Sequence, residues 1–165
     1  SAASDVYKRQ SINGIEETDF IFLLGTNPRF EATILNARIR KAYLQNKTKI
    51  ISLNEMGDLT FPYQSLDGNT ETVKKIIEGK HEVSDLIKQA KKPMVIMGQS
   101  ALKSKSSKYI FESIKLFLEN NNKISTDWNA LNIISENAST VGAFDLGIYK
   151  TTNGDNEVLK DLIAQ

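Results

Sequence analysis

The stretch from Phe20 to Leu44 constrains the fold more than any other part of this 165-residue chain. It opens with an unbroken apolar run, Phe20 to Leu24, and Gly25-Thr26-Asn27-Pro28 follows at once. Such a run is typical of a strand that is buried on both faces, as in a parallel sheet. After Pro28 the apolar spacing becomes helical, with one stripe that contains Ala32, Leu35, Ile39, Ala42 and Tyr43. The sequence therefore predicts a strand, a tight loop with Asn27 as the helix N-cap, and a helix.

Two further apolar segments predict two more strands, at Lys49–Leu53 and Met94–Met97. Helical spacing lies between them, in one helix over residues 70–79 and a second over residues 82–90. Three parallel strands with helices between them indicate the α/β class. We expect a doubly wound, mainly parallel sheet with Rossmann-like βαβ units.

The remaining segments carry weaker patterns. Residues 59–68 and the polar residues 100–108 are expected to be loops, and a helix is expected over residues 108–120. Thr126-Asp127 resembles a cap, which predicts a further helix that bears Trp128, Leu131 and Ile134. Packing is expected for Val141, Ala143, Phe144 and Leu146, and a helix is expected over residues 156–165.

The domain organisation is expected to be simple. Residues 1–10 are small and polar and lead into no element, so we expect a disordered or foreign leader there. Residues 11–165 are expected to form one partial domain, because three strands are fewer than such sheets usually have. The apolar outer strands would also be edges open to pairing.

The composition excludes several classes of function. The formal net charge is +1, so no strong field favours nucleic acid or an anionic membrane. The chain contains no cysteine, which excludes disulfides, thiolate metal sites and cysteine-ligated iron–sulfur clusters held by this sequence. No apolar stretch approaches the roughly 20 residues that span a bilayer.

Two glycine-containing loops are the candidate binding features. Gly25-Thr26-Asn27 joins a buried strand to a helix, and Gly98-Gln99-Ser100 follows the third predicted strand. A loop of the first kind points backbone amides at one spot, where an anion such as phosphate can bind. The alternative stays open, because most strand-to-helix loops in α/β proteins bind nothing.

Other motifs point away from catalysis. Glu55 follows the second strand, where a ribose-binding acid would lie, but the glycine fingerprint of dinucleotide sites is missing, as is the Walker motif. Gly98-Gln99-Ser100 imitates the start of a nucleophile elbow without its second glycine. His81 is expected to be a solvated residue near a helix start, and no metal-ligand spacing occurs. We therefore predict no catalytic residue and no metal site.

The first helix and its loop are basic, with Arg29, Arg38, Arg40 and Lys41. The simpler interpretation is a solvated helix face, since charged residues are mostly exposed. The alternative is a contact with an acidic neighbour or with a neighbouring domain.

Five segments carry a family resemblance: LLGTNPRFEATILNARIRKAYL, DLTFPY with SLDG, AKKPMVIMGQSAL, DWNALNII and AFDLG. In order and spacing they resemble the C-terminal molybdopterin-oxidoreductase-like region of the large iron–sulfur subunit of respiratory complex I, NADH:quinone oxidoreductase. The resemblance covers about Ile15 to Gly147. Thr33 and Ile34 depart from it, since the family more often has Pro and a Leu-like residue there.

The resemblance implies a role for both loops. In enzymes of the wider family, the loop that matches Gly25-Thr26-Asn27 approaches the molybdopterin guanine dinucleotide cofactor, and Gly98-Gln99-Ser100 would share that site. In the complex I subunit the site is expected to be a vestige, with no cofactor bound by this fragment. The iron–sulfur clusters are expected in cysteine-rich N-terminal domains that this chain does not contain.

The function that the resemblance implies is structural. The fragment would be a non-catalytic part of the complex I subunit, supporting electron transfer from NADH to quinone and contacting iron–sulfur domains and other subunits of the hydrophilic arm. It would lie peripherally, on the cytoplasmic face of a bacterial inner membrane or the matrix side of the mitochondrial one. The alternatives are a fragment of a catalytic molybdopterin guanine dinucleotide-dependent oxidoreductase, or an unrelated small anion- or nucleotide-binding module.

Overall fold

The computed structural model describes residues 14–103 and 105–134. Its elements are η1 (Ile15–Glu17), β1 (Phe20–Leu24), α2 (Pro28–Glu31), α3 (Thr33–Asn46), β2 (Lys49–Ser52), β3 (Gln64–Ser65), α4 (Thr70–Ile77), α5 (Glu82–Gln89), β4 (Pro93–Met97), α6 (Gln99–Leu102), α7 (Ser107–Asn120) and β5 (Leu131–Ile133). The leader predicted at residues 1–10, the packing predicted at residues 141–146 and the helix predicted at residues 156–165 lie outside the described residues. None of the described helices is long and apolar enough to cross a membrane.

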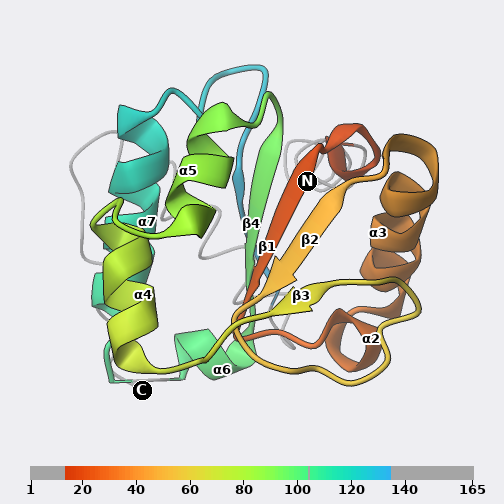
Figure 1. The fold of residues 1–165 in the computed structure, drawn as a ribbon, viewed down its shortest axis with the longest axis horizontal. Helices are drawn as coiled ribbons and strands as arrows, with labels where there is room; N and C mark the ends of the chain where they lie inside the picture. Colours follow the sequence, from red (N-terminus) through yellow and green to blue (C-terminus); the bar gives the residue numbers. More distant parts are fainter. Residues whose placement is uncertain (1–13, 104, 135–165) are drawn as a thin grey trace, which may run out of the picture.

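The strands form one five-stranded sheet in the order β3-β2-β1-β4-β5, and each neighbouring pair is parallel. At its centre, Phe22 of β1 lies opposite Ile51 of β2 on one side and Val95 of β4 on the other. Figure 1 shows α2 and α3 on one side of the sheet and α4, α5 and α7 on the other. The predicted α/β class and doubly wound parallel sheet are confirmed.

The unbroken apolar run of β1 is explained by two cores, one on each face of the sheet. Phe20, Phe22 and Leu24 pack with residues of α4, α5 and α7. Ile21 and Leu23 point the other way and pack with residues of η1 and α3. Because successive side chains of a strand alternate between its faces, a strand covered on both sides needs apolar residues at every position.

Most predicted helices are present, with two changes. The first predicted helix is divided in two at Ala32, whose φ of −154° and ψ of 78° interrupt the helical path between α2 and α3. Its predicted stripe still packs inward, since Ile39 and Ala42 are buried. In addition, the segment predicted as a polar loop after β4 begins with the short helix α6.

The predicted helix after Thr126-Asp127 is wrong, because Leu131–Ile133 forms strand β5. Val95 N donates to Ala130 O at 2.6 Å, and Ile134 N donates to Met97 O at 2.8 Å. The apolar spacing of this short segment suits a helix or a strand, and the open edge of β4 decides for the strand. The expectation of three strands is therefore also wrong.

The loop predicted over residues 59–68 contains the second unpredicted strand, β3. Its two residues, Gln64 and Ser65, are exposed and polar, so they carry no hydrophobic signal. They pair with Ile51 and Ser52 of β2. The apolar strand β2 is thus covered by a short polar edge strand, which is one way in which sheets protect their edges.

Candidate functional site

The two predicted loops meet at the carboxyl ends of β1 and β4. In the strand order β3-β2-β1-β4-β5, the chain adds β2 and β3 on one side of β1 and then adds β4 and β5 on the other side. Ligands of open α/β sheets bind at such a switch point, in the crevice beyond the strand ends. Gly25-Thr26-Asn27 follows β1 directly, and Gly98-Gln99-Ser100 follows β4. The structure therefore brings together the two segments that the sequence singles out.

Backbone hydrogen bonds join these two loops. Gly98 N donates to Leu24 O at 3.0 Å, and Ser100 N donates to Gly25 O at 3.1 Å. The Ser100 amide lies at the start of α6, and a free amide at such a position can donate to a bound anion. Here it donates to Gly25 of the first loop instead.

Glycine is required at both positions for this close approach. Gly25 has a φ of +62°, and a Cβ added to it would lie 2.5 Å from Ala101 N. A Cβ on Gly98 would lie 2.3 Å from the Thr26 Cβ and 2.7 Å from Gly25 O. The two glycines therefore serve contacts between the loops themselves.

Glu31, the last residue of α2, is half-buried and lies beside both loops. The hydroxyl of Thr26, a fully buried residue, donates to Glu31 Oε2 at 2.6 Å. The same carboxylate oxygen would lie 2.7 Å from a Cβ on Gly98. A carboxylate thus lies beside both loops, next to Thr26 of the first and Gly98 of the second.

This arrangement does not fit a phosphate group or an anionic dinucleotide. A phosphate brought to the loops would meet the negative charge of Glu31, and like charges in a partly buried site repel strongly. The Ser100 amide is also already bonded to Gly25. Sequence reasoning missed Glu31, because an acid in the first turn of a helix is ordinary and gives no sign that it turns back toward Thr26.

Asn27 and Arg29 fix the first loop to the segment after β2. Asn27 is the N-cap of α2, as predicted, but its side chain makes no capping hydrogen bond. Its Nδ2 donates to Met56 O at 3.1 Å, and its buried Oδ1 has no partner among the described residues. Arg29 Nη1 donates to Asp58 O at 2.7 Å and pairs with Asp58 Oδ2 at 3.0 Å. The first loop is therefore fixed by the segment after β2 as well as by the amide of Ser100.

Glu55, considered above as a ribose-binding acid, is part of the same fixed segment. The Tyr63 hydroxyl donates to the Glu55 carboxylate, and Gly57 N donates to Glu55 Oε1 at 3.2 Å. The Tyr63 hydrogen bond, followed by one from Ser65, lowers the pKa of the Glu55 carboxyl. Burial, and then the hydrogen bond to Glu55, raises the pKa of Tyr63. The Glu55 carboxylate therefore stabilises the segment from Glu55 to Tyr63 through these hydrogen bonds.

His81 caps a helix, in agreement with its predicted place near a helix start. Its Nδ1 accepts a hydrogen bond from Val83 N at 3.1 Å at the beginning of α5. Ser100, the serine of the segment that imitates a nucleophile elbow, is exposed in α6. Within residues 14–103 and 105–134, no three His, Cys, Asp or Glu side chains are grouped to hold a metal ion.

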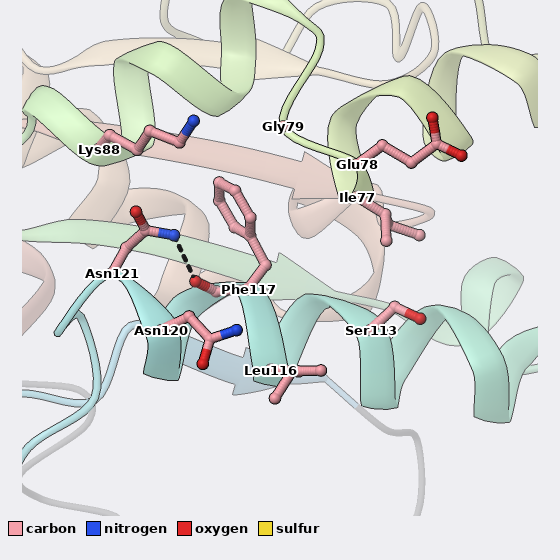
Figure 2. Close-up of a pocket in the computed structure, with 9 residues that line it drawn as sticks. All are labelled: Ile77, Glu78, Gly79, Lys88, Ser113, Leu116, Phe117, Asn120 and Asn121. Carbon is pink, nitrogen blue, oxygen red and sulfur yellow. Dashed lines mark hydrogen bonds between the residues drawn. The ribbon is translucent and has the colours of Figure 1, made fainter.

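A separate hollow of about 400 Å³ opens between α7 and the segment joining α4 to α5 (Figure 2). Lys88 Nζ lies 5.8 Å from the centre of the Phe117 ring. Asn121 Nδ2 donates to Phe117 O at 2.7 Å, as Figure 2 shows. Its walls come from helices and helix ends, and no predicted site residue lines it, so this hollow is distinct from the two loops at the strand ends.

Comparison with known proteins identifies relatives. The sequence profile of the family described as "Molybdopterin oxidoreductase" matches residues 2–162. The chain is 38% identical over 151 residues to the NADH-ubiquinone oxidoreductase 75 kDa subunit of Reclinomonas americana, a match that covers 92% of this chain and 22% of that protein.

Two further relatives have similar names. The chain is 35% identical over 138 residues to the mitochondrial NADH dehydrogenase [ubiquinone] iron-sulfur protein 1 of Solanum tuberosum, covering 84% of this chain and 19% of that protein. It is 38% identical over 138 residues to the mitochondrial NADH-ubiquinone oxidoreductase 78 kDa subunit of Candida albicans, covering 83% of this chain and 19% of that protein. The chain thus spans between 19% and 22% of the length of these three relatives.

Proposed function

The chain belongs to the molybdopterin oxidoreductase family, and from that premise we propose that it is a structural, non-catalytic part of the large iron–sulfur subunit of an NADH–ubiquinone oxidoreductase. The names of its relatives support this assignment over a catalytic molybdopterin enzyme. In the whole subunit, iron–sulfur clusters held by other segments would carry electrons from NADH towards quinone. This segment would hold those parts and neighbouring subunits in position.

The observation that carries the proposal is the position of the Glu31 carboxylate beside the two loops at the strand ends. An enzyme that used molybdopterin guanine dinucleotide would need room and free donors for anionic groups near Gly25 and Gly98. Here the Glu31 carboxylate, bonded to Thr26, occupies that position, and α6 packs against Gly25. A site that has become part of the packing is consistent with a scaffold whose ancestral pocket is no longer used.

Pterin analysis of the full-length protein, purified in its native assembly, tests the proposal. The bound pterin would be released, oxidised to a fluorescent derivative and quantified against the amount of subunit. We expect far less than one molybdopterin per subunit. A stoichiometric amount would overturn the proposal in favour of the catalytic molybdopterin enzyme.

A second measurement separates a scaffold from a catalytic role. Glu31→Ala in the full-length subunit removes the carboxylate that Thr26 holds, so it is expected to lower the amount of assembled complex. NADH oxidation per assembled complex is expected to stay unchanged. A lower rate per complex with normal assembly would contradict a purely structural role.

The location follows from the same proposal. Two of the relatives carry mitochondrial names, which supports a place in the hydrophilic arm on the matrix side of the mitochondrial inner membrane. The bacterial counterpart would be the cytoplasmic face of the inner membrane. Protease protection in mitoplasts and in inverted vesicles would distinguish the two sides of the membrane.

A further inference from the structure

The outward side of α2 and α3 carries large apolar side chains that the cores of this domain do not use. Phe30 is 81% exposed, Ile34 73% and Leu44 57%. The opposite side of α3 is already buried, through residues such as Ile39 and Ala42. A helix that is apolar on a second side is typical of one that is covered on that side too.

Helical spacing gathers the exposed residues of α3 into one surface, and Phe30 lies in α2, directly before that helix. Ile34, Ala37, Lys41 and Leu44 follow one another at intervals of three and four residues, so they lie along one side of α3. Figure 1 places α3 at the outer edge of its layer, with α2 directly before it. We define the α3 outer face as Phe30, Ile34, Ala37, Arg40, Lys41 and Leu44.

The charge of this surface has one sign. Helix α3 contains Arg38, Arg40 and Lys41 but no Asp or Glu, whereas α4, α5 and α7 each contain at least one acid. Neighbouring carboxylates are already engaged: Glu16 with Lys41 at 2.8 Å and Asp58 with Arg29 at 3.0 Å. Arg40 is in none of the ion pairs found among the described residues.

From this combination we propose that the α3 outer face is a docking surface for an acidic segment of another polypeptide in the same assembly. The inference rests on the proposed function, which supplies the assembly. Phe30, Ile34 and Leu44 are the apolar anchors, and a carboxylate of the partner pairs with Arg40. Covering an arginine without such a partner would leave an unpaired charge out of water. A second copy docked through the same face would bring two acid-free helices together, which charge repulsion disfavours.

Photo-crosslinking in the full-length protein within its native assembly tests the proposal. A benzophenone-bearing phenylalanine would replace Phe30 in one variant and Leu44 in another. Leu116 on α7 is the matched control, since it is also 57% exposed but lies on the opposite side of the sheet, on a helix that contains acids and is therefore not expected to bind an acidic segment. We expect crosslinks from positions 30 and 44, above the yield at 116, to one segment of another polypeptide in which Asp and Glu outnumber Lys and Arg.

Substitutions measure how much individual residues of the α3 outer face contribute to retention of the subunit in the assembly. Leu44→Glu is expected to weaken retention of the subunit in the assembly by about tenfold, as the loss of an interface anchor does, whereas Leu116→Glu leaves retention unchanged. Arg40→Glu is expected to weaken retention too, and replacing the facing acid of the cross-linked segment by Lys is expected to restore it. Thermal unfolding of each variant shows whether the fold is kept, because both leucines are exposed.

Several outcomes would overturn the proposal. These are equal yields at 44 and 116, or crosslinks to a lipid, to a second copy, to the same chain or to a basic segment. Failure of the charge exchange to restore retention would contradict the role of Arg40. None of these results bears on the proposed function, which pterin content and NADH oxidation per complex test separately.

Discussion

At the scale of single residues, Gly25 is restricted both by its backbone conformation and by its neighbours. Its φ of +62° is unfavourable for any residue with a Cβ, and Ala101 leaves no room for one. Gly25→Ala is therefore expected to lower the free energy of unfolding by more than about 2 kcal/mol, from backbone strain and steric overlap together. Urea unfolding of the 165-residue chain measures this loss.

Gly57 is the matched control for this substitution. Its φ of +67° is nearly the same, but nothing lies within 4 Å of an added Cβ. Gly57→Ala is expected to cost only the backbone strain, about 1 kcal/mol. Equal losses at the two positions would show that the contact between Gly25 and α6 contributes nothing.

Glu55 provides a prediction for pH. Because its pKa is lowered in the folded chain, its contribution to stability is present above its ordinary pKa of 4.5 and is lost as the pH falls through the lowered value. Tyr63→Phe removes the largest cause, so the pKa of Glu55 is expected to rise towards 4.5. Carbon-detected NMR titration of the carboxyl groups measures it.

Glu78 is the internal reference in the same titration. Its pKa is lowered chiefly by the hydrogen bond from Lys80, which does not involve Tyr63. The pKa of Glu78 is therefore expected to be the same in both proteins. If the pKa values of Glu55 and Glu78 moved together, the effect would be global and not a property of the Tyr63 contact.

The candidate site was predictable in part at this scale. A glycine after each of two buried strands is visible in the sequence, and the structure brings Gly25 and Gly98 together. The contact of Thr26 with Glu31 was not predictable, because an acid in the first turn of a helix is ordinary and does not indicate which side chain it contacts. The interruption of the helix at Ala32 was not predictable either, because no proline or glycine lies there.

At the scale of elements, the helix ends allow a direct comparison of caps. Asn69 is the N-cap of α4, and its side chain accepts a hydrogen bond from Thr72 N at 2.8 Å. Asn69→Ala is expected to cost about 1 kcal/mol of stability. Ser106 holds the same position in α7 without a side-chain cap bond, so Ser106→Ala is expected to change stability by less than about 0.5 kcal/mol. Equal changes in urea unfolding would contradict this assignment.

The strands show what an apolar pattern can and cannot predict. β1 and β4 are buried at every position and β2 at three of its four, and the sequence places all three within one residue of their observed bounds. β3 has two exposed polar residues, and β5 has three residues in a segment whose spacing also suits a helix. Both strands form because the edges of β2 and β4 offer hydrogen-bond partners. The local sequence pattern contains no information about those edges.

At the scale of the whole molecule, protection should decrease from the centre of the sheet to its edge. β1 is buried at all five positions and lies between two partner strands, whereas β3 lies at an exposed edge. Amide exchange in β1 is therefore expected to be at least about a hundredfold more protected than in β3. Hydrogen exchange followed by NMR tests this, and similar protection in both strands would contradict the layered architecture.

The position of β1 also has a consequence for synthesis of the protein. Its second partner, β4, comes much later in the chain: the Asp19 carboxylate before β1 accepts from the Lys92 amide before β4, 73 residues further on. On the ribosome, the apolar edge of β1 therefore stays unpaired until β4 has emerged. Chaperones that bind nascent chains would have to cover this edge until β4 is available. A translational pause before residue 97 would prolong the exposure.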